Sequence, residues 1–126
     1  MRRNTVGLRC VAELILPRLN LLVIRSPDIE RAIRFYEILG LALLKHAHGS
    51  GPEHYTAVAV DGSVFEIYPL LPGQRPTTDT RFGFAVDNVD DLVPALGKEG
   101  ATVVVRPHDR DERRHAVVTD LDGHRV

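Results

Sequence analysis

The sequence predicts an α+β fold built from two copies of one βαβββ unit. Matching features recur sixty positions apart, so that Asp28 corresponds to Asn88 and Gly40 corresponds to Gly100. Self-similarity at a fixed offset indicates an internal duplication. The chain has 126 residues, 44% of them hydrophobic, which is enough for one domain with a real core. We therefore expect a single domain made of two related modules.

The first unit begins with a strand and a helix. Residues 19–25 (LNLLVIR) are apolar and partly β-branched, as in a buried strand. Ser26 then suits a helix cap, and Pro27 suits the first helical turn. Gly40 suits the end of that helix. One apolar helix face follows from the i, i+3, i+4, i+7 spacing of Ile29, Ala32, Ile33 and Tyr36.

Three further strands complete the first unit and the second unit repeats the order. Residues 41–44, 54–60 and 63–68 read as strands, with Asp61-Gly62 as a two-residue hairpin turn. In the second unit we expect strands at 81–87, 101–106 and 114–119, with a helix that starts after Asn88 and runs through Lys98. The predicted boundaries are an arm at 1–18 and one domain at 19–126. Within that domain, module one is 19–70, the Pro- and Thr-rich linker is 71–79, and module two is 80–126.

Composition excludes several classes of function. The 16 basic and 17 acidic side chains leave no strong field for nucleic acid or an anionic membrane, so neither is expected as a partner. The single cysteine, Cys10, can form no intrachain disulfide, which favours a cytoplasmic location. The N-terminal apolar run is interrupted by Glu13 and ends at Pro17, which argues against a secretory signal. No stretch approaches the length of a membrane span.

Strand alternation predicts which side chains share a face with Glu66, a carboxylate in an otherwise apolar strand. A two-residue Asp61-Gly62 turn would pair Ala57 with Glu66 and Tyr55 with Tyr68, and paired residues share a face. The face carrying Glu66 would then also hold Tyr55, Ala57 and Tyr68. The opposite, helix-side face would hold Thr56, Val58, Val60, Phe65 and Ile67.

Three motifs in this order, FYEILGL, GFAVDNVDDL and DLDGH, carry a family resemblance. Together with the doubled unit, they make residues 19–126 resemble the vicinal oxygen chelate superfamily, which includes glyoxalase I, extradiol dioxygenases and bleomycin or fosfomycin resistance proteins. The resemblance implies a cupped mixed β-sheet with helices on its convex side. It also implies a ligand on the concave face, often with a divalent metal. The fold alone leaves the chemistry open.

The resemblance places four metal-ligand positions, and this chain departs from most of them. The positions fall on Leu21, Glu66, Arg81 and the residue after Val126. Leucine has no donor atom and arginine stays protonated, so neither can coordinate a cation. We therefore expect no metal and no cofactor, and we expect the Arg81 guanidinium to pair with Glu66 in the place of the ion.

Several histidines and one arginine are weaker candidates for the functional site than Glu66. His46 and His48 stand two residues apart beside Gly-Ser-Gly-Pro, which favours a flexible loop over the mouth of the cup rather than a metal site. By the predicted register, His54 falls on the helix side. Arg114 or His115 could instead reach an anionic ligand.

Three functions remain open. The leading hypothesis is a metal-independent protein that binds a small, partly apolar molecule through Leu21, Val23, Tyr55, Tyr68, Arg81 and His115. The second is a glyoxalase- or dioxygenase-like enzyme, a lyase, isomerase or oxidoreductase, in which Glu66 is the catalytic acid or base, with or without a metal. The third is an inactive, truncated relative. Exposed sheet edges lead us to expect a homodimer.

Overall fold

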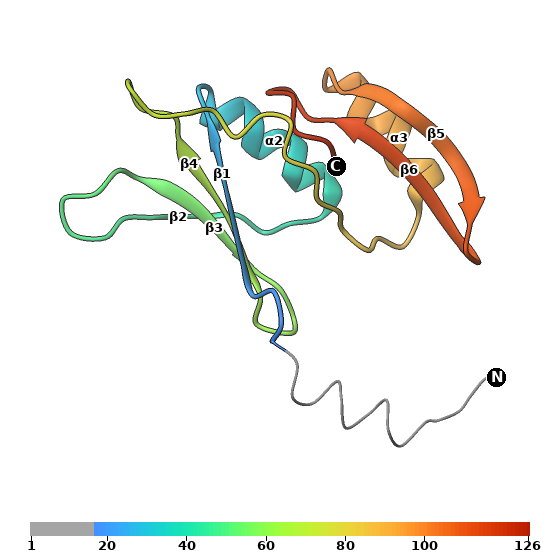
Figure 1. Cartoon of the computed structure of the whole chain (residues 1–126), viewed down its shortest axis with the longest axis horizontal. Coiled ribbons are helices and arrows are strands. Elements are labelled where there is room, and N and C mark those ends of the chain that lie inside the picture. Colours follow the sequence, from blue (N-terminus) through green and yellow to red (C-terminus); the bar gives the residue numbers. More distant parts are fainter. Residues whose placement is uncertain (1–16) are drawn as a thin grey trace.

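The computed structural model describes residues 17–126. Most of the predicted arm, including Cys10, lies outside the described residues. The rest is a mixed α+β fold with a curved mixed sheet and two helices, which confirms the predicted fold class (Figure 1). Among the described residues, no helix is long and apolar enough to cross a membrane.

Module one has the predicted βαβββ order. Its sheet is arranged β1-β4-β3-β2, with β1 parallel to β4 and the other neighbours antiparallel (Figure 1). Its elements are β1 (Leu21–Ser26), α2 (Ile29–Leu39), β2 (Leu44–His46), β3 (His54–Val58) and β4 (Val64–Pro69).

Local hydrogen bonds explain where α2 begins and ends. Asp28 is the N-cap, because its side chain accepts a hydrogen bond from the backbone N–H of Arg31. Ser26, the expected cap, lies two residues before Asp28, and its hydroxyl accepts a hydrogen bond from the backbone N–H of Asp28. Gly40 ends the helix with φ of 112°, a left-handed conformation that favours glycine. The helix buries Ala32, Ile33, Phe35 and Tyr36 against the sheet.

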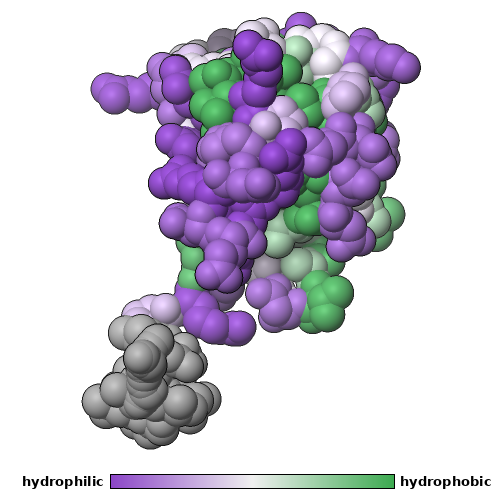
Figure 2. Space-filling model, turned by 90° about the vertical axis from the view of Figure 1, so that its right-hand side faces the viewer, coloured by the Kyte–Doolittle hydropathy of each residue, from purple (hydrophilic) through white to green (hydrophobic). Residues whose placement is uncertain are grey.

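Module two has fewer strands than module one among the described residues. It contains α3 (Val89–Lys98), β5 (Thr102–Arg110) and β6 (Arg113–Thr119), and the two strands pair antiparallel. Hydrophilic residues dominate the side of the molecule that these strands form, with hydrophobic patches between them (Figure 2). The strand predicted at 81–87 is wrong beyond its first residue, because only Arg81 forms a bridge, to Arg125.

Module one shows what the 81–87 segment needs in order to become a strand. There, β4 runs between β1 and β3 and pairs with both. The corresponding position in module two starts at Arg125, which bridges both Arg81 and Thr119, and continues with two hydrogen bonds between Val118 and Val126. A cavity of about 360 Å³ lies next to Val126 and is lined by this segment, α3 and β6. Phe82 N–H donates to Arg125 O, but within residues 17–126 no strand pairs with residues 83–87.

The two modules share one hydrophobic core. The fully buried Tyr36 ring on α2 contacts Phe65 of β4 at 4.9 Å between centroids, and Phe82 and Phe84 of module two at 6.4 and 6.3 Å. Leu96 of α3 belongs to the same cluster. The modules therefore meet through the sides that carry their helices.

A buried polar network joins the modules beside that core. The Tyr36 hydroxyl donates to Asp120 Oδ2 at 2.5 Å, and His124 Nδ1 lies 2.8 Å from the same oxygen. His124 Nε2 is 2.6 Å from the Thr77 hydroxyl, which accepts from the backbone N–H of Arg25 in β1. Thus α2, β6, the linker and β1 are held by one chain of hydrogen bonds.

The network shifts the pKa values of its members in opposite directions. Burial, followed by the charge of Asp120, raises the pKa of Tyr36 far above its usual value. Burial alone would raise the pKa of Asp120 too. Hydrogen bonds from His124 and Tyr36 outweigh that effect, and the pKa of Asp120 is lowered. Asp120 is therefore a buried carboxylate that the network keeps ionised.

The turn between β3 and β4 differs from the prediction by one residue. Ala59 N–H donates to Ser63 O, so the loop has three residues, Val60, Asp61 and Gly62. Asp61 accepts hydrogen bonds from both the N–H and the hydroxyl of Ser63, which stabilises this longer turn.

The longer turn changes the pairing along both strands. Thr56 pairs with Glu66 and Tyr55 pairs with Ile67. A slip of one residue turns every side chain of β3 to the other face. The prediction that Tyr55 and Ala57 share a face with Glu66 is therefore wrong, as is the helix-side placement of Thr56 and Val58.

We expect Tyr36→Phe to lower the free energy of unfolding by about 1.5–3 kcal/mol, because it removes a donor from a buried carboxylate. Tyr55→Phe is the matched control, since its hydroxyl makes one exposed hydrogen bond to Glu30 and should change stability by only about 0.5 kcal/mol. Urea unfolding measures both. Equal effects would contradict the importance assigned to the network.

The lowered pKa of Asp120 predicts an acid-sensitive fold. A carboxyl group with a depressed pKa in the folded state stabilises fully above its unfolded pKa, about 3.9, and that contribution is lost as the pH falls through the folded value. Asp120→Asn should therefore be less stable than the wild type at pH 7 and should lose less stability between pH 7 and pH 3. Parallel acid curves for the two proteins would contradict this.

The homodimer stays a prediction, and the structure supplies a reason for it. One edge of β6 pairs with β5. Among the described residues, the other edge pairs with Val126 at Val118 but has no backbone partner from Arg113 to Val117, and such edges favour association. Light scattering at micromolar concentration should give twice the mass of one chain. A monomer over that concentration range would contradict it.

Candidate functional site

One face of the four-stranded sheet carries most of the predicted site and lies opposite the face that packs on α2. We call it the Glu66 face. Phe65, Ile67 and Ala57 point to the helix side and are buried in the core. The pairing register puts the alternate residues on the Glu66 face, namely Leu21, Val23, Arg25, Leu44, His46, His54, Thr56, Val58, Val64, Glu66 and Tyr68.

Glu66 is the one carboxylate among the strand residues listed for this face. Its side chain is 16% exposed and lies in β4 between β1 and β3. The Oε2 atom accepts a hydrogen bond from the Thr56 hydroxyl at 2.9 Å and lies 3.5 Å from His54 Nε2. The predicted placement of Glu66 and Tyr68 on one face, together with Leu21 and Val23, agrees with the register.

His54 is the residue that sequence reasoning placed on the wrong side. It is 1% exposed, and its ring stacks on Tyr68 with centroids 4.0 Å apart and planes 7° apart. Nδ1 lies 3.2 Å from the Pro52 carbonyl, an acceptor only, so Nδ1 carries the proton in that hydrogen bond. Nε2 then presents its lone pair to the site and, among the described residues, has no hydrogen-bond partner.

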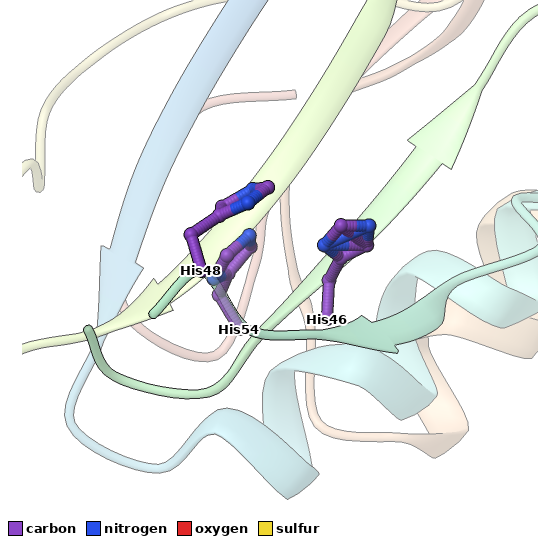
Figure 3. Close-up of side chains that lie close together, drawn as sticks. All are labelled: His46, His48 and His54. Atoms are coloured by element: carbon purple, nitrogen blue, oxygen red, sulfur yellow. The ribbon is translucent and has the colours of Figure 1, made fainter. Parts of the chain in front are cut away.

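His46 and His48 approach the same place from β2 and the loop after it. The three imidazoles point toward one another (Figure 3), with ring centroids 4.6 Å apart for His46 and His48, and 5.7 and 5.3 Å from these to His54. One ring nitrogen of each lies within 4.8 Å of the others. His46 and His48, which were expected in a loop over the cup, therefore lie beside His54, which the predicted register had placed on the other face.

The predicted contact between Glu66 and Arg81 is wrong. The polar neighbours of Glu66 are Thr56 and His54, and within residues 17–126 no hydrogen bond or ion pair joins it to Arg81. The reason is the packing of the modules through their helix sides, which gives module two a separate sheet. Arg81 lies instead at the cavity of module two.

The metal positions of the family do not fit a metal in this chain. Leu21 has no donor atom, Arg81 carries a fixed positive charge, and Glu66 already accepts a hydrogen bond from Thr56. With two of the four positions unable to supply a ligand atom, the set falls short of the ligand number that zinc or iron requires. No step of a reaction can be derived through a metal at these positions.

A second cluster, Asp120, Asp122 and His124, also brings ligand-type atoms within 4.8 Å of one another. Its atoms are already used within the fold. Asp120 accepts from Tyr36 and His124, and Asp122 Oδ1 forms a 2.7 Å ion pair with Arg31 of α2. We therefore regard this cluster as structural.

The cavity of module two gathers the remaining predicted residues. It is lined by apolar side chains of α3 and β6, with Arg81, Arg114 and His115 as its polar members. Arg114 already donates to Asp90 and Asp109, so its charge is matched. The predicted site residues are thus divided, with Leu21, Val23, Glu66 and Tyr68 on the Glu66 face, Arg81 and His115 at this cavity, and Tyr55 on the helix side.

Solved structures share this fold. A glyoxalase family protein from Bacillus cereus is 24% identical, with a TM-score of 0.71, and the match covers 87% of this chain and 91% of that one. An antibiotic binding protein from Streptomyces sp. CB03234 is 23% identical, with a TM-score of 0.66 and coverages of 88% and 93%. A glyoxalase/dioxygenase from Nostoc punctiforme is 20% identical, with a TM-score of 0.67 and 88% of each chain covered. At these identities the likeness shows the fold alone.

Sequence comparison gives the family. No curated protein matches the chain significantly. The family model described as Glyoxalase/Bleomycin resistance protein/Dioxygenase superfamily matches residues 18–126. This range includes both modules and every residue of the Glu66 face, so the chain belongs to the Glyoxalase/Bleomycin resistance protein/Dioxygenase superfamily.

Proposed function

We propose that the protein binds a small, partly apolar molecule on the Glu66 face, and that binding needs no metal at the family's ligand positions. The observation that carries this proposal is the nearly buried Glu66 carboxylate, which lies on the side of the sheet opposite α2, a side that no helix of residues 17–126 covers. A carboxylate held out of water in this way costs free energy unless it has partners. Thr56 supplies one, and a ligand with a donor group would supply another.

The surroundings of Glu66 suit a ligand with an apolar body. Leu21, Leu44 and Val58 are exposed large hydrophobic residues on the same face. Tyr68, stacked on His54, adds an aromatic surface. Apolar surface with a few convergent polar groups is the usual composition of a small-molecule site. A cationic or hydrogen-bond-donating group on the ligand would match Glu66.

Relatives in the same fold support the class of function. The Streptomyces protein is described as antibiotic binding, and another solved structure with this fold, 21% identical with a TM-score of 0.62, is described as the oxidase ChaP-H2. Binding and catalysis both occur on this scaffold. The cytoplasmic location suggested by the single cysteine belongs to the same proposal.

Catalysis is the second candidate, and one contact favours it. His54 Nε2 and Glu66 Oε2 lie 3.5 Å apart in a little-exposed site, so a bound molecule could contact an imidazole and a carboxylate together. Glu66 would act as acid or base toward the bound molecule, with Thr56 fixing its orientation.

The binding proposal is tested with three matched probes, 1-naphthylmethylamine, 1-naphthalenemethanol and 1-naphthoate, in the presence of EDTA. The probes share one apolar body and differ in charge. Calorimetry should give the amine about tenfold tighter binding than the alcohol, and the carboxylate the weakest binding, because Glu66 is negative.

Two variants assign the effect to the site. Glu66→Gln should remove most of the preference for the amine, whereas Glu37→Gln, an exposed carboxylate of α2, should leave it unchanged. Absence of binding by all three probes, or an unchanged preference in Glu66→Gln, would overturn the proposal.

A further inference from the structure

We propose that His46, His48 and His54 form a binding site for one divalent transition metal, with Zn²⁺ as the best match. The site is displaced from the family's ligand positions, since none of the three histidines occupies one of them. It goes beyond the proposed function, which requires no metal. Two independent observations carry it, namely the convergence of three imidazoles and the orientation of the buried one.

Convergence follows from the strand pairing and the loop. His46 and His54 are direct cross-strand partners in β2 and β3, so both project from the same face. The loop between them turns back at once, because Gly51 N–H donates to His48 O at 2.9 Å and Gly49 adopts φ of 56°. This return places the His48 ring close to the rings of His46 and His54 (Figure 3).

The orientation of His54 is that of a metal ligand. A ligating histidine usually donates its other ring N–H to a carbonyl or carboxylate, which fixes the tautomer. His54 meets this condition through Nδ1 and the Pro52 carbonyl. The buried Nε2 has no hydrogen-bond partner within the described chain, and an unused buried nitrogen costs free energy that a metal bond would offset.

An ion pair with Glu66 accounts less well for His54. A protonated imidazole would donate from Nε2 to the carboxylate, but the two atoms are 3.5 Å apart and form no hydrogen bond. Glu66 Oε2 instead accepts from Thr56. In the metal-bound state, the Glu66 carboxylate contributes negative charge beside the cation.

The ligand set indicates the class of metal. Neutral imidazoles suit zinc, copper and nickel, and they suit calcium or magnesium poorly. Three protein ligands leave a tetrahedral ion with one open position, which is the arrangement of zinc sites that bind water or a substrate. The open position would lie beside Glu66 and Tyr68, where the proposed small molecule binds.

The test uses the untagged full chain, stripped of metal and titrated with Zn²⁺ alone. Equilibrium dialysis with elemental analysis should find one zinc per chain, and zinc should raise the melting temperature. His46→Ala and His48→Ala should each weaken zinc binding by about tenfold or more, since each removes one of three ligands. Both side chains are exposed, so both variants should fold.

His108→Ala is the matched control, because this histidine lies in β5, outside the cluster. It should bind zinc as the wild type does. His54→Gln should lose binding, and its circular dichroism spectrum would show whether it folds. Absence of stoichiometric zinc in the wild type would overturn the proposal, as would equal affinity in His46→Ala, His48→Ala and the wild type. Failure here leaves the naphthyl-probe result intact, since those measurements contain EDTA.

Discussion

The arrangement of the two modules depends on one buried carboxylate, Asp120. It sits where the end of β6 meets α2 and holds the Tyr36 hydroxyl and the His124 ring at once. Through His124 the network reaches Thr77 of the linker, and through Thr77 it reaches the backbone of β1. A buried charge is costly unless hydrogen-bond donors surround it. Because the donors to Asp120 come from different elements, their hydrogen bonds fix those elements relative to one another. The shared aromatic core around Tyr36 then packs against a fixed frame.

This packing decides which surfaces remain for function. Because the modules meet through their helix sides, neither described helix, α2 or α3, covers the opposite face of the four-stranded sheet. Glu66 lies on that face, yet it is mostly withdrawn from water by its strand neighbours and by His54. The same packing keeps Arg81 with α3 and β6 rather than beside Glu66. Leu21 and Arg81 cannot hold an ion beside Glu66, and Arg81 is not paired with it, so the Glu66 carboxylate can accept a further partner besides Thr56.

His54 connects the parts of the candidate site. Its ring stacks on Tyr68 and lies beside the rings of His46 and His48, its Nδ1 is held by the loop carbonyl of Pro52, and its Nε2 lies 3.5 Å from Glu66. The stacking and the Nδ1 contact fix the ring in one orientation and leave Nε2 without a hydrogen-bond partner among the described residues. An aromatic surface, a carboxylate and a set of nitrogen donors are therefore gathered within one patch of the sheet. Ligand binding and metal binding would use adjacent parts of that patch.

The sequence by itself determined the order of elements, the family and the two faces of β4. These depend on local features, such as the spacing of apolar residues in α2, the Gly40 helix end, and the alternation of Phe65 and Ile67 with Glu66 and Tyr68. The sequence could not determine the register between β3 and β4, because a two-residue and a three-residue turn both fit Asp61-Gly62. The choice rests on hydrogen bonds from Ser63 to Asp61 and on burial of Ala57. Nor could it place residues 82–87, since a segment becomes a strand only when another strand pairs with it. Only the tertiary structure therefore decided that His54 replaces Tyr55 beside Glu66, because face and partner are set by contacts between strands that local sequence does not encode.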